Sequence, residues 1–97
     1  MISVLLPVFD PNLKHLKLCL KGLRESNYEQ LELIIVADLS SSYTEATALK
    51  LLIDNYRNSM SIKFNIRAGK SGISSALNLG ISLSEGEFVA RIDCDDI

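Results

Sequence analysis

Three aspartates stand together near the end of the chain, in the segment Asp93-Cys94-Asp95-Asp96. In an extended segment alternate side chains project to the same side, so Asp93 and Asp95 would face one way. Two neighbouring carboxylates repel each other unless a proton or a cation lies between them. Hard carboxylate oxygens suit Mg²⁺ or Mn²⁺, which often complete their coordination with water and substrate phosphates. On its own the motif more often marks a solvated acidic loop, but its position directly after an apolar strand favours a metal site.

Further candidate binding residues follow or precede the other predicted elements. Asp38 ends the second predicted strand, where its carboxylate could accept hydrogen bonds from a nucleobase or a ribose, or could simply form a turn. Phe9 ends the first strand and could stack on a base, although an aromatic residue there more often belongs to the core. Pro7 has no backbone donor to lose near a strand end and could shape the floor of a crevice. Lys70 opens the third predicted helix, whose N-terminus would favour an anion.

Four strand-like segments separated by three amphipathic segments must position these residues. The strand-like segments are residues 2–8, 31–37, 62–66 and 88–92. The first two are continuous apolar runs, which are typical of strands buried on both faces. The third alternates apolar with polar residues, as expected of a strand nearer the edge of a sheet.

Each predicted helix carries apolar residues at spacings of three and four. The apolar faces consist of Leu13, Leu16, Leu20 and Leu23 in the first helix, Ala46, Leu49, Ile53 and Tyr56 in the second, and Ile73, Ala76, Leu77, Gly80 and Ile81 in the third. Asp10, followed by Pro11, is predicted to cap the first helix. Ser42 with Glu45 forms a capping-box pattern before the second, and Gly80 would let the third helix approach the sheet closely.

Alternation of strands and helices predicts an α/β fold with a parallel βαβαβαβ sheet. Right-handed crossovers place helices on both faces of such a sheet. The expected strand order is third, second, first, fourth, with a switch point between the first and fourth strands. Ligands of such sheets bind at the carboxyl ends of the strands near the switch point. Phe9 and Asp10 after the first strand and the acidic cluster after the fourth would therefore line one crevice.

Composition limits the classes of protein to consider. The chain has 97 residues, a length that predicts one domain. Its net charge is −2, with acidic and basic residues interspersed, which gives no support for nucleic-acid binding. Cys19 and Cys94 lie far apart, which favours thiols in a reducing compartment. No apolar run approaches the ~20 residues that span a bilayer, and the N-terminus resembles a strand, not a signal peptide. We expect a cytoplasmic protein, with contact to the inner face of the membrane as an option.

Four segments resemble the motifs of the family 2 glycosyltransferases, whose catalytic domain has the Rossmann-like GT-A fold. Residues 2–10 are similar to the opening strand of that family, which usually ends P-V-Y-N. Residues 32–40 are similar to E-I-I-V-V-D-D-G-S, residues 72–80 match G-x-x-x-A-x-N-x-G, and residues 86–96 match G-E-Y-I-A-x-x-D-x-D-D. The resemblance covers essentially the whole chain, with the four motifs in order at the expected spacing.

This resemblance implies roles for individual residues. Pro7 and Phe9 would line the base pocket, and Asp38 would hydrogen-bond the base. Asp93 and Asp95 would contact the ribose and the Mn²⁺ or Mg²⁺ ion that bridges the diphosphate, where the ion acts as a Lewis acid. Lys70 stands in the same nucleotide-binding region.

The activity implied by the family is inverting transfer of a sugar from a nucleotide-diphosphate sugar, with a UDP-sugar expected. The acceptor would be a saccharide or a lipid-linked molecule, in bacterial cell-surface polysaccharide synthesis. The family's catalytic base lies downstream of its D-x-D motif, so we expect residues 1–97 to be an N-terminal nucleotide-binding part, truncated after the fourth strand, without a catalytic residue or activity of its own. The uncovered fourth strand would also favour self-association into a homo-oligomer.

Departures from the family pattern keep alternatives open. Ala37 and Leu39 replace the first aspartate and the glycine of D-D-G-S, while Lys70 and Asp10 stand where asparagine is common. These changes affect the base pocket and are compatible with a non-catalytic nucleotide-binding or interaction domain of the same fold. A flavodoxin-like protein or a sugar nucleotidyltransferase is a third hypothesis. The glycine- and arginine-rich loop that a nucleotidyltransferase should carry after its first strand is missing.

Overall fold

The computed structural model describes residues 1–26, 30–68 and 72–93, with side chains from Ser75 onward in the last range. Its elements are β1 (Ile2–Phe9), α1 (Leu13–Glu25), β2 (Leu31–Leu39), α2 (Ala46–Arg57), β3 (Ser61–Ala68), α3 (Gly72–Leu83) and β4 (Phe88–Arg91). Their order confirms the predicted alternation of strands and helices. Among the described residues, no helix combines the length and apolar character that crossing a membrane requires.

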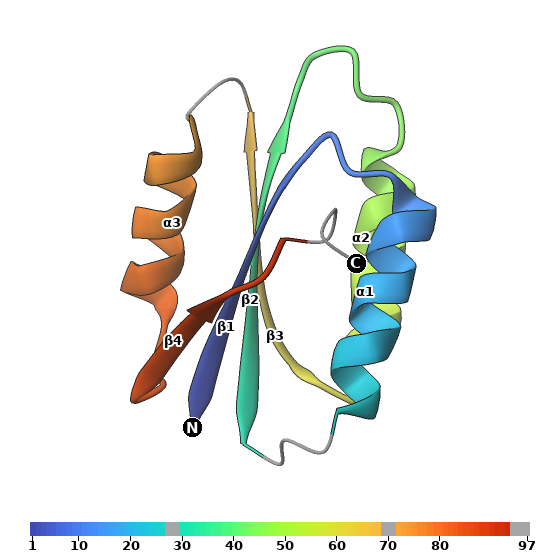
Figure 1. Cartoon of the computed structure of the whole chain (residues 1–97). Helices are drawn as coiled ribbons and strands as arrows, with labels where there is room; N and C mark the ends of the chain where they lie inside the picture. The colour runs from blue at the N-terminus through green and yellow to red at the C-terminus, as the bar shows by residue number, and fades with distance from the viewer. Residues whose placement is uncertain (27–29, 69–71, 94–97) are drawn as a thin grey trace.

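The four strands form one parallel sheet in the order β3-β2-β1-β4, as predicted. Helices α1 and α2 cover one face and α3 covers the other (Figure 1). Strand β3 lies at one edge and β4 at the other, which leaves β1 and β2 in the middle. The central position explains why β1 and β2 have continuous apolar sequences, because both of their faces are covered.

The main core lies between the sheet and the two helices α1 and α2. Leu16 and Leu20 of α1 and Leu49 and Ile53 of α2 are buried there, together with every second residue of β2, such as Ile35. The predicted apolar faces of both helices are thereby confirmed. Cys19 is a buried residue of the same α1 face, while Cys94 lies outside the described residues.

A smaller core lies between the sheet and α3. Ala76 is buried against Leu5, Ile34 and Val36, and a Cβ added at Gly80 would approach Leu5 Cδ2 to 3.0 Å. The predicted close approach of α3 to the sheet is therefore confirmed. The prediction for the next residue was wrong, because Ile81 is 53% exposed. It lies about 100° further around the helix than the glycine that faces the sheet.

Both predicted N-caps were wrong. Helix α1 is capped by Asn12, whose Oδ1 accepts hydrogen bonds from the amides of Lys14 at 3.0 Å and His15 at 3.2 Å. Asp10 instead adopts φ 40° and directs its carboxylate to Ser40, accepting from the Ser40 amide at 2.8 Å and hydroxyl at 2.6 Å. Asp10 is thus engaged by a tertiary contact that a local sequence pattern does not contain.

The expected capping box of α2 is replaced in the same way. Helix α2 begins at Ala46 after Glu45, which makes no side-chain cap hydrogen bond. The Ser42 hydroxyl lies 2.9 Å from the Ser40 hydroxyl. The serines of this turn therefore join the loop after β1 to the loop after β2, and do not cap the helix.

A buried polar network lies toward the amino ends of the strands. Glu32 is only 2% exposed, and its Oε2 accepts hydrogen bonds from the Ser3 hydroxyl at 2.8 Å and the Glu85 amide at 3.0 Å. Lys63 Nζ lies 2.7 Å from its Oε1, and the Gly86 amide donates to Ser3 Oγ at 2.9 Å. The network thus joins three strands to the turn that precedes β4.

The network also sets the protonation of Glu32. Burial alone would raise the pKa of its carboxyl, but hydrogen bonds from Lys63, Glu85 and Ser3, together with the charge of Lys63, outweigh burial, and the pKa of Glu32 lies below its usual value. A carboxyl group whose pKa falls on folding stabilises the native state above its unfolded pKa, and this contribution is lost as the pH falls through the folded pKa.

We predict that the difference in free energy of unfolding between the wild type and Glu32→Gln is largest near neutral pH. It should shrink as the pH falls below roughly 4.3, the ordinary pKa of glutamate. Urea unfolding across this pH range measures the difference, with Glu25→Gln on the exposed surface of α1 as the control. A difference that stayed constant down to acid pH would contradict the assignment.

We also predict opposite effects of alanine at two glycines. A Cβ at Gly86 would come within 2.7 Å of the Ser3 amide nitrogen and 2.8 Å of the Met1 carbonyl oxygen, so backbone would have to move. Gly86→Ala should lower the free energy of unfolding by about 1–3 kcal/mol. Gly22→Ala is the control, since a Cβ there meets nothing within 4 Å and should stabilise α1 by ~0.5–1 kcal/mol. Thermal unfolding with equal effects of the two changes would contradict this account.

Candidate functional site

Residues at the carboxyl ends of three strands form one row across the sheet. Phe9 of β1 pairs in register with Asp38 of β2, which pairs with Arg67 of β3. Residues paired in this way point to the same face, because side chains alternate along each strand. This face is the one that α3 covers, since Arg67 Nη1 donates to the Ser75 hydroxyl of α3 at 2.7 Å.

Asp38 does not stand alone in this row. Its two carboxylate oxygens accept hydrogen bonds from Arg67, from Nε at 2.6 Å and from Nη2 at 2.8 Å, and both side chains are largely buried. Such a two-point pair fixes the orientation of both planar groups. The site therefore presents an oriented carboxylate and guanidinium, whereas the sequence predicted only the carboxylate.

Arg67 is the residue of this site that the sequence analysis missed. It lies at the end of an alternating strand, where a charged residue is common on a solvated face. Its partner is 29 positions away in the sequence, and only the register of β2 against β3 brings the two together. The detectable signal was a basic residue at the carboxyl end of a strand predicted to neighbour the strand of Asp38.

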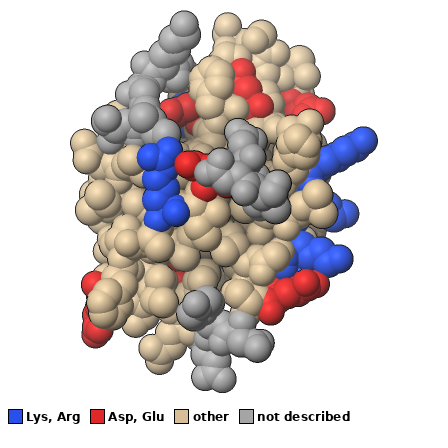
Figure 2. All heavy atoms as spheres, in the orientation of Figure 1, with Lys and Arg blue, Asp and Glu red and all other residues tan. Residues whose placement is uncertain are grey.

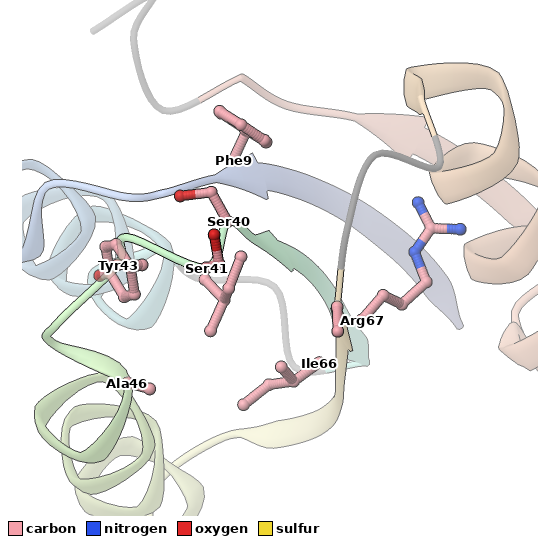
Figure 3. A pocket seen from close by; sticks show the side chains of 9 residues that line it. Phe9, Ser40, Ser41, Tyr43, Ala46, Ile66 and Arg67 are labelled. Carbon is pink, nitrogen blue, oxygen red and sulfur yellow. The ribbon is translucent and has the colours of Figure 1, made fainter.

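An open pocket of about 480 Å³ adjoins this row at the carboxyl ends of the strands. It is lined by Phe9, Leu39, Ser40, Ser41, Tyr43, Ala46, Ile66, Arg67 and Ala68. In Figure 3, Tyr43 and Ala46 lie on one side, while the side chain of Arg67 points away from them toward the other side. Phe9 stands above the strand ends and is 59% exposed, so its ring is accessible to a ligand.

Two loops that form the rim of the pocket are tied together. Besides the contacts of Asp10 with Ser40, the Tyr43 hydroxyl donates to the carbonyl oxygen of Pro11 at 2.7 Å. Burial and the negative charges of Glu45 and Asp10 raise the pKa of Tyr43. The tyrosine therefore stays protonated at neutral pH and keeps its donor, which holds the segment after Phe9 in place.

The other predicted site residues are only partly within the described structure. Asp93 follows β4 and accepts a hydrogen bond from Arg91 Nε at 3.2 Å. Since β4 runs parallel to β1 with Leu5 paired to Arg91, Asp93 lies past the end of β4 toward the carboxyl edge. Pro7 lies in β1 two residues before Phe9 and is half-buried. Lys70 and Asp95 lie outside the described residues, so their predicted roles stay predictions.

Of the predicted metal ligands, the described structure contains Asp93. Across residues 1–26, 30–68 and 72–93, no group of three or more histidine, cysteine, aspartate or glutamate residues gathers into a cation site. The Asp93 carboxylate fits a hard divalent ion in donor type. It is partly exposed and partly neutralised by Arg91, so an ion would compete with the guanidinium for the same oxygen.

The surface charge is less evenly mixed than the sequence suggested. Blue side chains gather over α1 along one side of the face shown in Figure 2. Exposed cations of α1 are Lys14, Lys17, Lys21 and Arg24, at spacings of three, four and three, which form one stripe on a helix. Arg24 also lies over the Tyr56 ring of α2, 4.9 Å from its centre. This stripe is local, and it does not include the residues of the candidate site.

Two solved structures that contain nucleotide sugars have the same arrangement of strands and helices. S. aureus TarS 1-349 in complex with UDP-GlcNAc superposes with a TM-score of 0.81 at 25% identity, covering 97% of this chain and 26% of that one. Mannosyltransferase PcManGT from Pyrobaculum calidifontis, in complex with GDP-Man and Mn²⁺, superposes with a TM-score of 0.79 at 20% identity, over 97% of this chain and 27% of that one. The second likeness concerns the fold alone, and together they confirm the predicted GT-A fold.

Proteins with a similar sequence are named as glycosyltransferases. The chain is 28% identical to the glycosyltransferase GlyG of Streptococcus pneumoniae serotype 4, over its whole length and 31% of that protein. It is 30% identical to the GalNAc(5)-diNAcBac-PP-undecaprenol beta-1,3-glucosyltransferase of Campylobacter jejuni, over 98% of the chain and 29% of that protein. The chain thus spans less than a third of the length of each of these relatives.

A family model also matches nearly the whole chain. The model for glycosyl transferase family 2 matches residues 3–97, which includes the four strands apart from Ile2 and all of the predicted site residues. The motifs, the strand order and this match agree, and the chain belongs to glycosyl transferase family 2.

Proposed function

We propose that the chain is the donor-binding part of an inverting glycosyltransferase that moves a sugar from a nucleotide-diphosphate sugar to a saccharide or lipid-linked acceptor. The observation that carries the proposal is the row of Phe9, Asp38 and Arg67 at the carboxyl edge of the parallel sheet. An exposed ring beside an oriented pair of hydrogen-bonding groups is what a nucleobase needs. Asp93 lies toward the same edge, where a ribose or diphosphate could reach it.

Each described residue has a specific part in this proposal. The Phe9 ring would stack on the base, and the Asp38–Arg67 pair would offer donors and acceptors to its edge. Pro7 would shape the floor beneath, and Asp93 would contact the ribose and hold the metal, with Asp95 as second carboxylate and Lys70 near the phosphates. A bound Mn²⁺ or Mg²⁺ would supply Lewis-acid stabilisation of charge on the diphosphate.

The relatives support the choice of donor and acceptor. TarS was solved with UDP-GlcNAc, and the C. jejuni relative is named for an undecaprenol-linked substrate and glucosyl transfer. We therefore propose a UDP-sugar as donor and a saccharide or lipid-linked acceptor, in cell-surface polysaccharide synthesis at the inner face of the membrane. We further propose that residues 1–97 bind the donor but do not transfer the sugar alone, since the base that would activate the acceptor is expected downstream.

A non-catalytic domain of the same fold is the second candidate, and it drew support from Ala37 and Leu39. In the structure Ala37 is fully buried in the main core, on the face opposite to Asp38. Its replacement of an aspartate therefore need not remove a group from the row of Phe9, Asp38 and Arg67. Leu39 lines the apolar side of the pocket. We therefore expect it to affect the preference for one base over another more than the ability to bind a nucleotide.

We predict that Phe9→Ala weakens UDP binding about 5- to 150-fold, because stacking of a base on an aromatic ring is worth about 1–3 kcal/mol. Thermal stability should stay nearly unchanged, since the ring is exposed. Isothermal titration calorimetry measures the affinity. The matched control is Phe88→Ala in β4, an aromatic ring that is 68% exposed at the other end of the sheet. Equal loss of UDP affinity in both variants would contradict the assignment of Phe9.

We predict that UDP binds more tightly in the presence of Mn²⁺, and that Asp93→Ala and Asp95→Ala each remove about tenfold or more of this gain. The reason is that each change deletes a carboxylate from the proposed metal site. Calorimetric titration of UDP with and without Mn²⁺ measures the gain.

Asp54→Ala is the control for this experiment. Asp54 is also an exposed aspartate paired with an arginine, at 3.1 Å from Arg57, but it lies on α2 away from the strand ends. Metal-dependent UDP binding that persisted in both site variants would exclude the proposed metal site, and loss of it in Asp54→Ala would show that the effect is not specific.

A further inference from the structure

Strand β4, which leads to Asp93, is weakly held by its own side chains. It has four residues and, among residues 1–26, 30–68 and 72–93, it pairs with β1 alone, on the outer side of the sheet. All four residues are exposed in the chain. Within the described residues, β4 is therefore held mainly by its backbone ladder with β1 and by the turn that precedes it.

That turn is fixed by the buried network described above. The amides of Glu85 and Gly86 donate to Glu32 and to Ser3 respectively, and the Glu87 amide donates to the Met1 carbonyl oxygen at 3.0 Å. Lys63 Nζ adds a hydrogen bond to the Leu83 carbonyl oxygen at the end of α3, at 2.7 Å. Three consecutive amides are therefore held by Glu32 of β2, by Ser3 of β1 and by Met1 just before β1.

The free-energy cost of burying a charged carboxylate suggests that the network has a role beyond stability. A carboxylate buried without partners is strongly destabilising, and an apolar residue of similar size is often at least as stabilising as a buried ion pair. Among the described residues no buried side-chain nitrogen or oxygen lacks a partner, so Glu32 is fully satisfied. What an apolar residue at this position could not do is accept the Glu85 amide and orient the Ser3 hydroxyl toward Gly86.

We propose that Glu32, together with Ser3, is a positioning residue for the nucleotide site, which fixes the start of β4 and thereby the place of Asp93. Glu32 touches no ligand itself, and the inference rests on the proposed function of Asp93. It assigns a role in the site to residues at the opposite end of the sheet.

The register of β4 is the link between the two ends. Asp93 lies seven residues after Gly86, a separation of at most roughly 23 Å if the segment were fully extended at ~3.3 Å per residue. A slip of one residue in pairing with β1 would turn every β4 side chain to the opposite face of the sheet. The face that carries Phe9 and Asp38 would then lose Asp93.

Glu32→Gln is the variant that tests this role with the least change in shape. In the wild type, Oε2 accepts from Ser3 and Glu85, while Oε1 faces Lys63. Glutamine has one acceptor oxygen and one NH₂ group. The NH₂ group must therefore face either the Lys63 ammonium or the backbone N–H of Glu85, and both of these are donors. Ser3→Ala is the second variant. It leaves the Lys63–Glu32 pair intact and removes the acceptor of the Gly86 amide together with one donor to Glu32.

The matched control is Glu85→Gln. Glu85 is exposed, and its carboxylate lies 3.4 Å from Lys63, so the same chemical change is made beside the same lysine. The backbone amide of Glu85, which the network uses, is retained. A general effect of lowering negative charge near Lys63 would appear in this control as well.

Two measurements are made on each variant. Hydrogen exchange followed by NMR reports the Glu87 and Ile92 amides, which bond to Met1 and Leu5, against the Asp10 amide, which bonds to the Asp38 carbonyl oxygen at 3.0 Å. Calorimetry reports UDP affinity with and without Mn²⁺. The second measurement separates positioning from general stability, because residues of β1, β2 and β3 provide most of the proposed metal-independent contacts, whereas Asp93, which follows β4, provides the proposed metal contact.

In Glu32→Gln and Ser3→Ala we expect faster exchange at Glu87 and Ile92, unchanged exchange at Asp10, and loss of about tenfold or more of the Mn²⁺-dependent gain in UDP affinity. Affinity for UDP without metal should fall less, by about two- to fivefold, since only the proposed hydrogen bond of Asp93 to the ribose is affected. Glu85→Gln should match the wild type in every measurement. Unchanged exchange in β4, or equal losses of affinity with and without metal, would overturn the proposal.

Failure of the proposed function has a different signature. If the wild type itself gains no UDP affinity from Mn²⁺, the metal role of Asp93 is wrong, and the positioning proposal falls with it. If the wild type shows the gain and Glu32→Gln and Ser3→Ala keep it despite faster exchange in β4, only the positioning proposal is overturned.

Discussion

Parallel pairing of β1 with β2 determines where both the core and the candidate site lie. Eight register pairs join the two strands, from Ile2 with Leu31 to Phe9 with Asp38. Both strands are buried between helices on each face, so a slip in their register would place apolar side chains in the wrong layer and is strongly disfavoured. The last pair of this ladder is also the centre of the candidate site, so packing of the core decides where the functional groups stand.

Acidic side chains lie at both ends of the sheet, but they differ in exposure to water. At the carboxyl edge, Phe9 is exposed and Asp93 is partly exposed, which leaves them accessible to a ligand. At the amino edge, Glu32 is withdrawn from water and every oxygen of its carboxylate is occupied. The first arrangement suits recognition of a charged nucleotide, and the second suits holding a short edge strand in one position. Both use acidic residues, and burial separates the two uses.

Much of the fold followed from the sequence because its signals are local. Continuous apolar runs predicted the two central strands, and the spacing of Leu16, Leu20, Leu49 and Ile53 predicted the helix faces that the core contains. The caps were wrong because their side chains are engaged over long distances: Asp10 binds Ser40, and the true cap of α1 is Asn12. A local pattern gives the preference of a residue, and tertiary contacts decided between competing preferences.

The site was predicted in part for the same reason. Strand ends and the parallel topology were enough to bring Phe9 and Asp38 to one edge, as expected. Arg67 required the register of β2 against β3, which periodicity does not contain. Glu32 resembled a family motif in the sequence, but its buried partners Ser3 and Lys63 come from two other strands. The residues that local patterns did not predict are therefore those held by contacts between strands that lie far apart in the sequence.

We propose that a nucleotide and a divalent ion bind at the carboxyl edge of this sheet. Paramagnetic line broadening of backbone amide resonances by Mn²⁺, recorded by NMR in the presence of UDP, locates the ion directly. We expect the strongest broadening at the ends of β1, β2 and β4, around Phe9, Asp38 and Asp93, and none around Glu32 at the amino edge. Broadening centred on the amino edge or on the outer surface of α1, or none that depends on UDP, would contradict it.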